Sequence, residues 1–320
     1  MGAEEMIPDN WELPVLVSGA SGQLGRLVVS HLLDTFKVPA DQIIATTRTP
    51  EKIADFARRG VVVREADFER PETLVKAFTG AKRALLISIW PDEEYPGQEG
   101  RRQRLQAGAV NAVREAGVPH VLITSAPNAE PGNPAHWHAA HYQTELAVIN
   151  SGLKWTILRN WDWPDSRWHR YWRKALETGV FRTAAGKSGS SFVAREDAAA
   201  AAAGALLSET SICRRFDITG PEVMTAEDIF STLEKLTGKK VKIEYVTPEE
   251  WERTYLAEGG DPFNLLIMPA HMRSELGGFF GGLSNAVEEL SGRRPMTMLE
   301  YLPRIMNSPD NSPTRIKKGT

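Results

Sequence analysis

A chain of 320 residues, of which 42% are hydrophobic and 25% charged, has a globular composition and can bury one large core or two modest ones. The net charge of −3 offers no bulk attraction to nucleic acid or an acidic membrane, and a single cysteine excludes an intrachain disulfide and a cysteine-rich metal site. No apolar run approaches the length of a membrane span, and residues 1–12 lack a signal-peptide layout. We therefore expect a cytoplasmic enzyme or sensor.

Strand and helix signals alternate along the first half of the chain. Apolar, β-rich runs predict strands, and helical apolar periodicity closed by glycine predicts helices. The predicted strands are 14–18, 42–47, 61–64, 84–88, 120–124 and 155–158, and the predicted helices are 23–36, 51–59, 71–78, 101–116 and 135–150. This alternation predicts an α/β fold of the Rossmann type, a doubly wound parallel sheet covered on both faces.

The pattern changes after residue 159. A tryptophan-rich stretch is followed by an alanine-rich helix at 195–207, a strand at 216–219 that returns to the sheet, a helix at 226–237 and a strand at 241–246. We expect a nucleotide-binding domain at 13–160, a smaller C-terminal α/β substrate-binding region at 161–306, and flexible termini at 1–12 and 307–320.

The run Gly19-Ala20-Ser21-Gly22-Gln23-Leu24-Gly25 directly follows the first strand. Its first glycine permits a tight turn, the second lets the backbone approach a diphosphate, and the third lets the helix pack close to the strand. Because a strand precedes the motif and a helix follows it, the motif predicts a dinucleotide site. The residues expected to hold the diphosphate are Gly19, Ser21, Gly22, Gln23, Leu24 and Gly25.

The end of the second strand indicates which dinucleotide binds. An NAD site usually carries an acidic residue there, but this chain has Arg48, with Lys52 close in sequence. A guanidinium can bind the 2′-phosphate of NADP, so we predict NADP(H); the alternative is a solvated surface arginine. Asp67 and Phe68 follow the third strand, where the adenine is expected, although Phe68 could equally belong to the core.

The carboxyl ends of the later strands should surround the nicotinamide. Ser125 follows the fifth strand and is expected near the reacting carbonyl; its alternative role is to cap the turn. The residues expected to line the nicotinamide end of the cofactor are Ser88, Ile89, Thr124 and Asn160.

The chain lacks the Tyr-x-x-x-Lys pair of short-chain dehydrogenases/reductases. In its place are His141-Tyr142-Gln143-Thr144-Glu145 and the segment Ser151-Gly152-Leu153-Lys154-Trp155-Thr156-Ile157-Leu158-Arg159-Asn160. These motifs resemble those of the NmrA-like branch of atypical short-chain reductases. The resemblance implies an NADPH-dependent reductase of quinones, triphenylmethane dyes or fungal secondary metabolites, or a nucleotide-sensing regulator. Where the family commonly has Asn-Gly-Trp-Tyr, this chain has Asn160-Trp161-Asp162-Trp163, so the substrate does not carry over.

Proton transfer has several candidates. His141 and Glu145 share a helical face, and the carboxylate there would fix the imidazole tautomer and raise its pKa, so that histidine could act as proton donor. The alternatives are a structural pair, Tyr142 as a rival donor, or water. The spacing of His136, His138 and His141 does not fit one helical face, so we expect no metal site.

Large aromatic residues after the sixth strand suit a flat, apolar substrate, although core packing explains some of them. Phe279 and Phe280 are flanked by glycine pairs within 277–282, a composition that fits either a mobile flap or an ordinary surface loop. The residues expected to contact substrate are Trp90, Trp161, Trp163, Trp168, Phe279 and Phe280.

These observations predict an NADPH-dependent reductase that transfers a hydride to an aromatic, quinonoid or enone/carbonyl small molecule, with a place in secondary metabolism. The partners expected are a small-molecule substrate and NADP(H), without nucleic acid or membrane, in a monomer or homodimer. Two alternatives remain: an NADP-binding sensor without turnover, and a non-redox cyclase or isomerase on the same scaffold.

Overall fold

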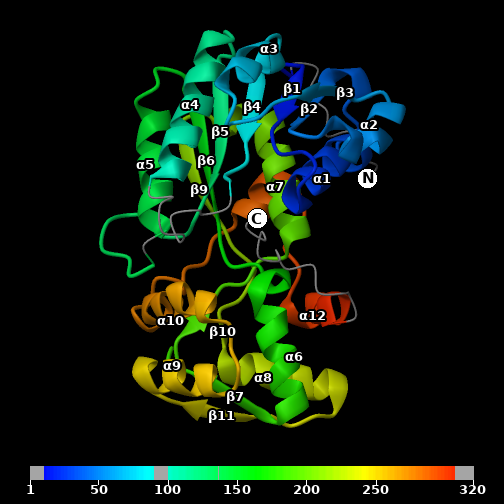
Figure 1. The fold of residues 1–320 in the computed structure, drawn as a ribbon. Coiled ribbons are helices and arrows are strands. Elements are labelled where there is room, and N and C mark those ends of the chain that lie inside the picture. The colour runs from blue at the N-terminus through cyan, green and yellow to red at the C-terminus, as the bar shows by residue number, and fades with distance from the viewer. Residues whose placement is uncertain (1–10, 90–99, 136, 307–320) are drawn as a thin grey trace. The chain divides into compact units, whose positions relative to one another are not determined.

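The computed structural model describes residues 11–89, 100–135 and 137–306. It contains two compact units (Figure 1). The first comprises the described parts of Met1–Asn160, Glu196–Ile218 and Asn285–Arg293, and the second those of Trp161–Arg195, Thr219–Ser284 and Arg294–Thr320.

The first unit is built on a parallel sheet of seven strands in the order β3-β2-β1-β4-β5-β6-β9. Leu16 on β1 is level with Ile44 on β2 and Ala84 on β4, so the chain order reverses between β1 and β4. A nucleotide binds at such a switch point in doubly wound sheets. The predicted α/β Rossmann-type fold is therefore confirmed. The strands are β1 Val15–Val17, β2 Ile43–Thr47, β3 Val62–Glu65, β4 Arg83–Leu86, β5 His120–Ser125, β6 Lys154–Asn160 and β9 Arg214–Ile218.

Helices cover the sheet of the first unit, as the ribbon shows (Figure 1). The helix predicted at 23–36 leaves α-geometry at His31, where a π-helical turn, His31–Thr35, begins. The buried His31 ring lies 2.9 Å from Thr35 Oγ1 through Nδ1 and 3.2 Å from the Glu196 carbonyl through Nε2. The helices are α1 Gln23–Ser30, α2 Ala54–Arg58, α3 Leu74–Phe78, α4 Arg101–Glu115, α5 Trp137–Ile149, α7 Arg195–Leu207 and α11 Ala286–Ser291, with 3-10 turns at Ala40–Gln42, Pro50–Ile53, Pro71–Thr73 and Glu209–Ser211.

Alternate strand residues supply the core on each face of the sheet. On one face, side chains of β1, β2, β4, β5 and β6 pack with α3, α4 and α5 in one buried cluster, which includes Leu16, Ile123, Phe78, Val113 and Val148. The alanine-rich helix α7 is almost entirely buried, which explains its small side chains. Both faces thus bury apolar area, as a parallel sheet requires.

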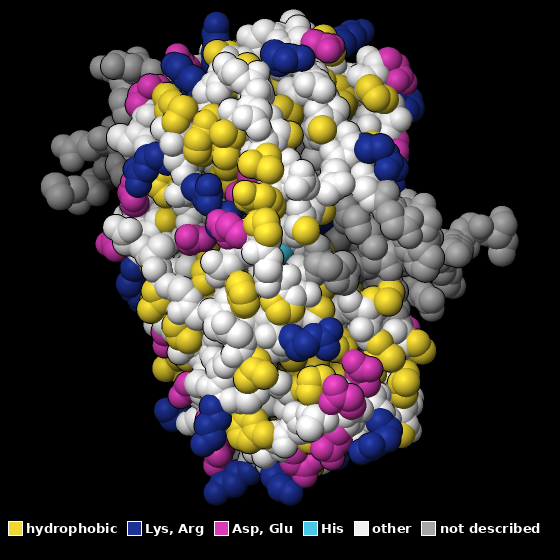
Figure 2. All heavy atoms as spheres, turned by 90° about the vertical axis from the view of Figure 1, so that its left-hand side faces the viewer, with side chains coloured by type: hydrophobic (Ala, Val, Ile, Leu, Met, Phe, Trp, Pro, Cys, Tyr) yellow, Lys and Arg dark blue, Asp and Glu magenta, His cyan; other side chains and the backbone are white. Residues whose placement is uncertain are grey.

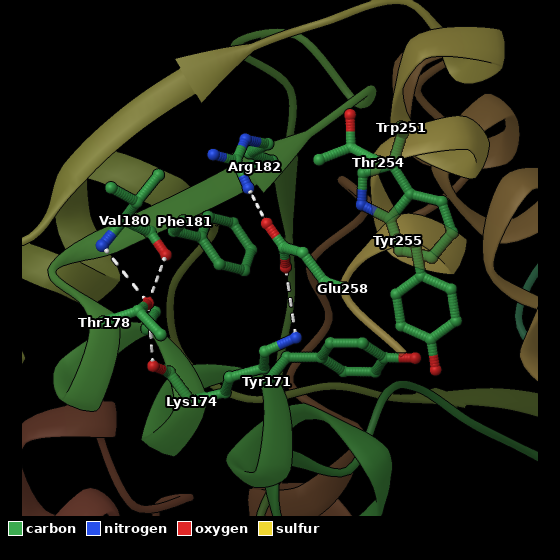
Figure 3. A pocket seen from close by; sticks show the side chains of 11 residues that line it. Tyr171, Lys174, Thr178, Val180, Phe181, Arg182, Trp251, Thr254, Tyr255 and Glu258 are labelled. Atoms are coloured by element: carbon green, nitrogen blue, oxygen red, sulfur yellow. Dashed lines mark hydrogen bonds and ion pairs between the residues drawn. The ribbon is translucent and has the colours of Figure 1, made fainter. Parts of the chain in front are cut away.

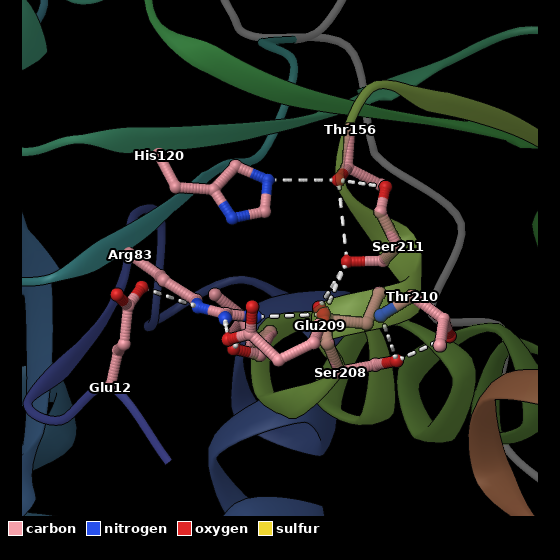
Figure 4. Close-up of polar contacts among 10 residues, drawn as sticks. Glu12, Arg83, His120, Thr156, Ser208, Glu209, Thr210 and Ser211 are labelled. Carbon is pink, nitrogen blue, oxygen red and sulfur yellow. Dashed lines mark hydrogen bonds and ion pairs between the residues drawn. The ribbon is translucent and has the colours of Figure 1, made fainter. Parts of the chain in front are cut away.

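A buried polar cluster fills the amino ends of the strands (Figure 4). Arg83, only 1% exposed, donates to the Ser208 carbonyl at 2.8 Å and forms an ion pair with Glu209. His120 Nε2 lies 2.9 Å from Thr156 Oγ1, while burial and the charges of Arg83 and Lys154 lower the pKa of His120 to about 3. This histidine is neutral at ordinary pH, and the cluster ties the end of α7 to the sheet at the edge opposite the glycine turn.

The second unit combines two small sheets with helices. β7 pairs in parallel with β11, and β10 pairs antiparallel with β8. Its core contains Trp168, Trp172 and Phe192 with side chains of α8, α10 and α12. Of the described helices, none is long and apolar enough to cross a bilayer. The elements are α6 His169–Thr178, β7 Val180–Thr183, β8 Gly189–Ser190, β10 Met224–Thr225, α8 Ala226–Thr237, β11 Lys242–Tyr245, α9 Pro248–Ala257, α10 Met268–Leu276 and α12 Met298–Met306, with a kinked turn at Pro164–Trp168, where Ser166 is not helical, and a 3-10 turn at Pro262–Leu266.

Candidate functional site

The glycine turn joins β1 to α1 at the carboxyl edge of the sheet. Gly19 has φ +60°, the left-handed region that favours glycine, and a Cβ on Gly25 would lie 2.4 Å from the Gly19 carbonyl oxygen. The strand and helix therefore approach as closely as glycine allows. Gly22 is the N-cap of α1 and is exposed.

The backbone of this turn retains unused donors. Gly22 N donates to the Gly19 carbonyl and Ala20 N to the Thr46 carbonyl, each at 2.9 Å. Within the described residues, the amide N–H groups of Ser21 and Leu24 have no acceptor. Free N–H groups at a helix N-terminus suit an anion, so the turn fits a diphosphate. The side chain of Leu24 is buried, so only its backbone can contribute.

The end of β2 lies beside this turn. Ser21 Oγ and Thr47 Oγ1 are 2.8 Å apart, which ties the glycine turn to β2. Arg48 follows Thr47 directly and is exposed, with no hydrogen bond or ion pair to any described residue. Lys52 is also exposed, and its carbonyl accepts from Arg26 at 3.0 Å. Arg48 therefore offers a guanidinium that no described residue binds, at the position where a ribose or its 2′-phosphate binds in such sheets.

Asp67 makes contacts within its own turn, and Phe68 packs against the core. Asp67 accepts from the Glu69 amide at 3.1 Å, and its Oδ2 lies 3.6 Å from Arg70 Nε. Phe68 is half-buried and packs against the core cluster of the first unit. Phe68 therefore packs against the core, which was one of its two expected roles. Only the part of its side chain that stays exposed could contact an adenine.

Hydrogen bonds join the carboxyl ends of β1, β4 and β5. Ser18 Oγ accepts from the Ile87 amide at 2.9 Å, Thr124 Oγ1 accepts from the Ser88 amide at 2.8 Å, and Thr124 Oγ1 donates to Ser88 Oγ at 3.1 Å. Ile89 is half-buried beside them, whereas Trp90 lies outside the described residues. These bonds give the floor of the predicted nicotinamide site a fixed geometry.

Beyond this floor, Ser125 begins a buried ion-pair network. Ser125 Oγ donates to Glu145 Oε1 at 2.6 Å, and Arg159 binds both oxygens of Glu145, each at 2.8 Å. Arg159 also lies 2.7 Å from Glu130, and Arg215 lies 3.0 Å from Glu130 and 3.8 Å from Glu145. Glu145 is 1% exposed and Arg159 is 4% exposed. Burial alone would lower the pKa of Arg159, but the hydrogen bonds that it donates to Glu145 and Glu130 outweigh burial and raise that pKa.

The sequence did not reveal this network. It identified Glu145 and Ser125 but assigned them to different tasks, and it assigned no role to Arg159, Glu130 or Arg215. A signal existed at one position: an arginine at the end of an apolar buried strand requires a carboxylate partner.

The network corrects the expectation for His141. Glu145 is directed to Ser125 and Arg159, and no described residue makes a hydrogen bond to His141. Burial, and then the charges of Arg102, His138 and Arg159, lower the pKa of His141 well below its ordinary value. A raised pKa was expected, so that part of the prediction is wrong, because burial disfavours the charged imidazole and the neighbouring positive charges act in the same direction. His141 is neutral at ordinary pH and cannot act as an imidazolium acid.

The other candidates near α5 are more loosely placed. Tyr142 is half-buried and makes no hydrogen bond to a described residue. His138 is buried with Nδ1 2.9 Å from Asn133 Nδ2, and His136 lies outside the described residues. Asn160, at the end of β6, is 9% exposed, and its Oδ1 has no hydrogen-bond partner among the described residues. The part of the chain that the structure describes holds no group of three or more residues arranged to bind a metal ion.

In the second unit, the tryptophan-rich stretch is mostly core. Trp168 is 6% exposed and stacks on Trp172 with ring centroids 6.2 Å apart. Trp161 is 4% exposed and packs where a Cβ on Gly282 would come within 2.7 Å of its ring. The expectation that Trp161 and Trp168 form an open substrate wall is therefore corrected: their rings are used in packing. Trp163 is half-buried, with the Arg195 guanidinium 4.7 Å from the centre of its ring.

The segment 277–282 is not a free flap. It ends α10, since Gly277 N donates to the Arg273 carbonyl and Phe279 N to the Ser274 carbonyl, each at 3.0 Å. Phe280 is 1% exposed, and its ring centroid lies 4.4 Å from that of His271. The two predictions for this segment, a mobile flap and an ordinary surface loop, are therefore both wrong for Phe280, which is buried in the core. Phe279 is half-buried.

Comparison with known proteins fits the site in the first unit. A model of an NAD(P)H-binding family matches residues 19–209, from the glycine turn to the end of α7. Quinone oxidoreductase 2 of Escherichia coli K12 is 31% identical over 296 residues, which cover 92% of this chain and 99% of the relative. An NmrA-like family domain-containing oxidoreductase, flvB, of Aspergillus flavus is 29% identical and covers 74% of this chain and 75% of its own length.

A solved structure agrees with the fold as well. The triphenylmethane reductase of Citrobacter sp., crystallised with NADP(H), superposes with a TM-score of 0.82 at 30% identity, over 91% of this chain and 99% of that one. The fold, the glycine turn and the motifs around residues 141–160 therefore agree with the family match. The chain belongs to the NAD(P)H-binding, NmrA-like family of oxidoreductases.

Proposed function

We propose that this chain is an NADPH-dependent reductase that transfers a hydride to a flat aromatic, quinonoid or conjugated carbonyl compound, such as an aromatic secondary metabolite. The observation that carries the cofactor choice is Arg48, an exposed guanidinium without a described partner, at the end of β2, where no acid stands. The substrate class is supported by relatives named for quinone and triphenylmethane reduction.

The residues of the first unit fit such a cofactor. Free amides at the start of α1 would bind the diphosphate, and Arg48, with help from Lys52, would bind the 2′-phosphate. Ser88 and Thr124 would support the nicotinamide end, and the buried Asn160 Oδ1, which has no partner among the described residues, could accept a hydrogen bond there. When bound, the nicotinamide supplies the hydride.

The protein contributes orientation and charge, without an imidazolium acid. Ser125 Oγ donates a hydrogen bond to Glu145, and the Arg159 guanidinium neutralises that carboxylate by binding both of its oxygens. Glu145 and Arg159 are therefore positioning residues for Ser125. Because His141 is neutral, we assign the proton to Tyr142 or to water, which suffices for a quinone acceptor. Trp163 and Phe279, both half-buried, remain the aromatic candidates for contact with the substrate.

A small-molecule partner also fits the surface charge. On the face drawn in Figure 2, Lys and Arg side chains are interspersed with Asp and Glu side chains, and no broad patch of one sign is visible. A nucleic-acid surface would need such a basic patch.

The direct test follows NADPH absorbance while the purified chain is mixed with naphthoquinones, triphenylmethane dyes, enones and aromatic ketones, with NADH as the control cofactor. We expect steady, enzyme-dependent NADPH oxidation with at least the quinones. Tight NADPH binding without turnover on any acceptor would contradict the reductase and favour the sensor. Product formation without net NADPH consumption would favour a cyclase or isomerase.

A further inference from the structure

The second unit contains an aromatic hollow that belongs to neither the nucleotide site nor the predicted substrate residues. Its volume is about 240 Å³, and it lies among α6, β7 and α9 (Figure 3). Trp251 and Tyr255 stack with centroids 4.8 Å apart and planes 8° apart, and Tyr171 lies 6.4 Å from Tyr255. Phe181 completes the apolar wall. The hollow is smaller than the roughly 300–1,000 Å³ of sites for drug-sized ligands, so it has room for one or two fused rings.

Charged side chains form the polar side of the hollow. The Glu258 carboxylate lies between Arg182 and Lys174: Lys174 Nζ is 3.1 Å from one oxygen, and Arg182 donates to the other (Figure 3). Burial alone would raise the pKa of Glu258, but the hydrogen bonds from Lys174 and Arg182 hold it below its ordinary value. Two cationic groups thus converge on one carboxylate at the aromatic wall, and Arg182 also donates through Nε to Glu244 at 2.8 Å.

We propose that this hollow binds a mono- or bicyclic aromatic carboxylate, whose ring packs on Tyr171 and Tyr255 and whose carboxylate replaces that of Glu258 between Lys174 and Arg182. The protein's own carboxylate shows that these two donors can hold such a group at this place. Once Glu258 is displaced, the guanidinium and the ammonium still outnumber the one carboxylate left on Arg182, that of Glu244, so the place favours an anion over a cation.

Displacement of Glu258 is feasible because its ion pairs are exposed. The side chains of Lys174, Arg182 and Glu258 are 47%, 31% and 41% exposed, and exposed pairs contribute little stability. Glu258 caps the end of α9, where no further helical turn restrains its side chain. A ligand that adds aromatic packing to the same ion pairs would therefore outcompete it.

The test uses 2-naphthoate as the probe and 2-naphthalenemethanol as its neutral analogue, in calorimetric titrations of the full chain saturated with NADPH. Glu258→Gln removes the competing carboxylate and should tighten naphthoate binding about tenfold, with little effect on the alcohol. Glu252→Gln, on the same helix but outside the hollow, is the matched control and should leave both affinities unchanged. Thr254→Trp fills the hollow and should abolish binding.

Three results would overturn the proposal. These are no naphthoate binding to either the native chain or Glu258→Gln at millimolar concentration, equal affinity in Glu258→Gln and Glu252→Gln, and binding that survives in a folded Thr254→Trp variant. Far-UV circular dichroism and retained NADPH binding establish that the variants fold. The titration measures no turnover, so its outcome is independent of the proposed reductase activity.

Discussion

Replacement of Arg159 by methionine tests the buried network at the end of the sheet. This change keeps a long side chain but removes the guanidinium that holds both oxygens of Glu145. Glu145 is 1% exposed, so its charge would remain buried with the Ser125 hydroxyl and with Arg215, whose Nε is 3.8 Å away. We therefore expect a large loss of stability.

The magnitude follows from the geometry. At 2.8 Å and an effective dielectric constant of about 20, the gross attraction of Arg159 and Glu145 is about 6 kcal/mol. Desolvation of both groups offsets most of this attraction when the pair forms, but removal of one partner leaves the other charge buried and costs about 3–5 kcal/mol. Since Arg215 compensates in part, we expect Arg159→Met to lower the free energy of unfolding by about 3 kcal/mol.

Urea denaturation followed by far-UV circular dichroism measures this loss. The matched control is Arg215→Met, because Arg215 is 38% exposed in the same network and its loss should cost less than about 1 kcal/mol. The double variant Arg159→Met/Glu145→Leu removes both buried charges and should recover much of the loss. If Arg159→Met cost no more than Arg215→Met, the account of a buried, mutually dependent pair would be refuted.

Three further predictions concern the cofactor, the histidine and a buried acid. Arg48→Asp should weaken NADPH binding about a hundredfold and NADH binding less than about threefold, as measured by calorimetry, because a carboxylate repels the 2′-phosphate; equal losses would contradict the role of Arg48. His141→Asn should leave the shape of the pH–rate profile unchanged, since His141 is already neutral; loss of a limb of the profile would restore it as an acid. The pKa of Glu275 is raised from 4.5 to about 8, chiefly by desolvation and then by the charge of Asp162. The stability that protonated Glu275 contributes is fully present below the pKa of the unfolded chain and is lost as the pH rises through the pKa of the folded chain. Between about pH 5 and about pH 8, the free energy of unfolding of the native protein should therefore fall by about 3–4 kcal/mol more than that of Glu275→Gln. Urea unfolding at several pH values measures this difference, and the same pH dependence in both proteins would contradict it.

The sheet and its nucleotide turn could be predicted because their signals are local. Runs such as residues 43–47 are apolar enough to require burial on both faces, and the spacing of the three glycines is set by contacts within seven residues. The helix 195–207 was also predictable, since its seven alanines have the highest helix propensity. In contrast, α9 and α10 were not predicted, because their helical faces are mixed and their burial comes from other parts of the second unit.

The polar site was harder because partners come from different elements. The i, i+4 spacing of His141 and Glu145 places them on one face of a helix. It cannot show that Arg159, on the neighbouring strand, binds the carboxylate. Aromatic composition likewise cannot distinguish core residues from residues that contact a substrate. Trp168 and Phe280 are as suitable for a core as for a substrate wall, and only their burial distinguishes the two roles.

The most direct measurement is a calorimetric titration of the purified chain with NADPH and, in parallel, with NADH. We expect one site that binds NADPH much more tightly than NADH, with the difference lost in Arg48→Asp. Absence of binding to both nucleotides, or equal affinity for the two, would contradict it.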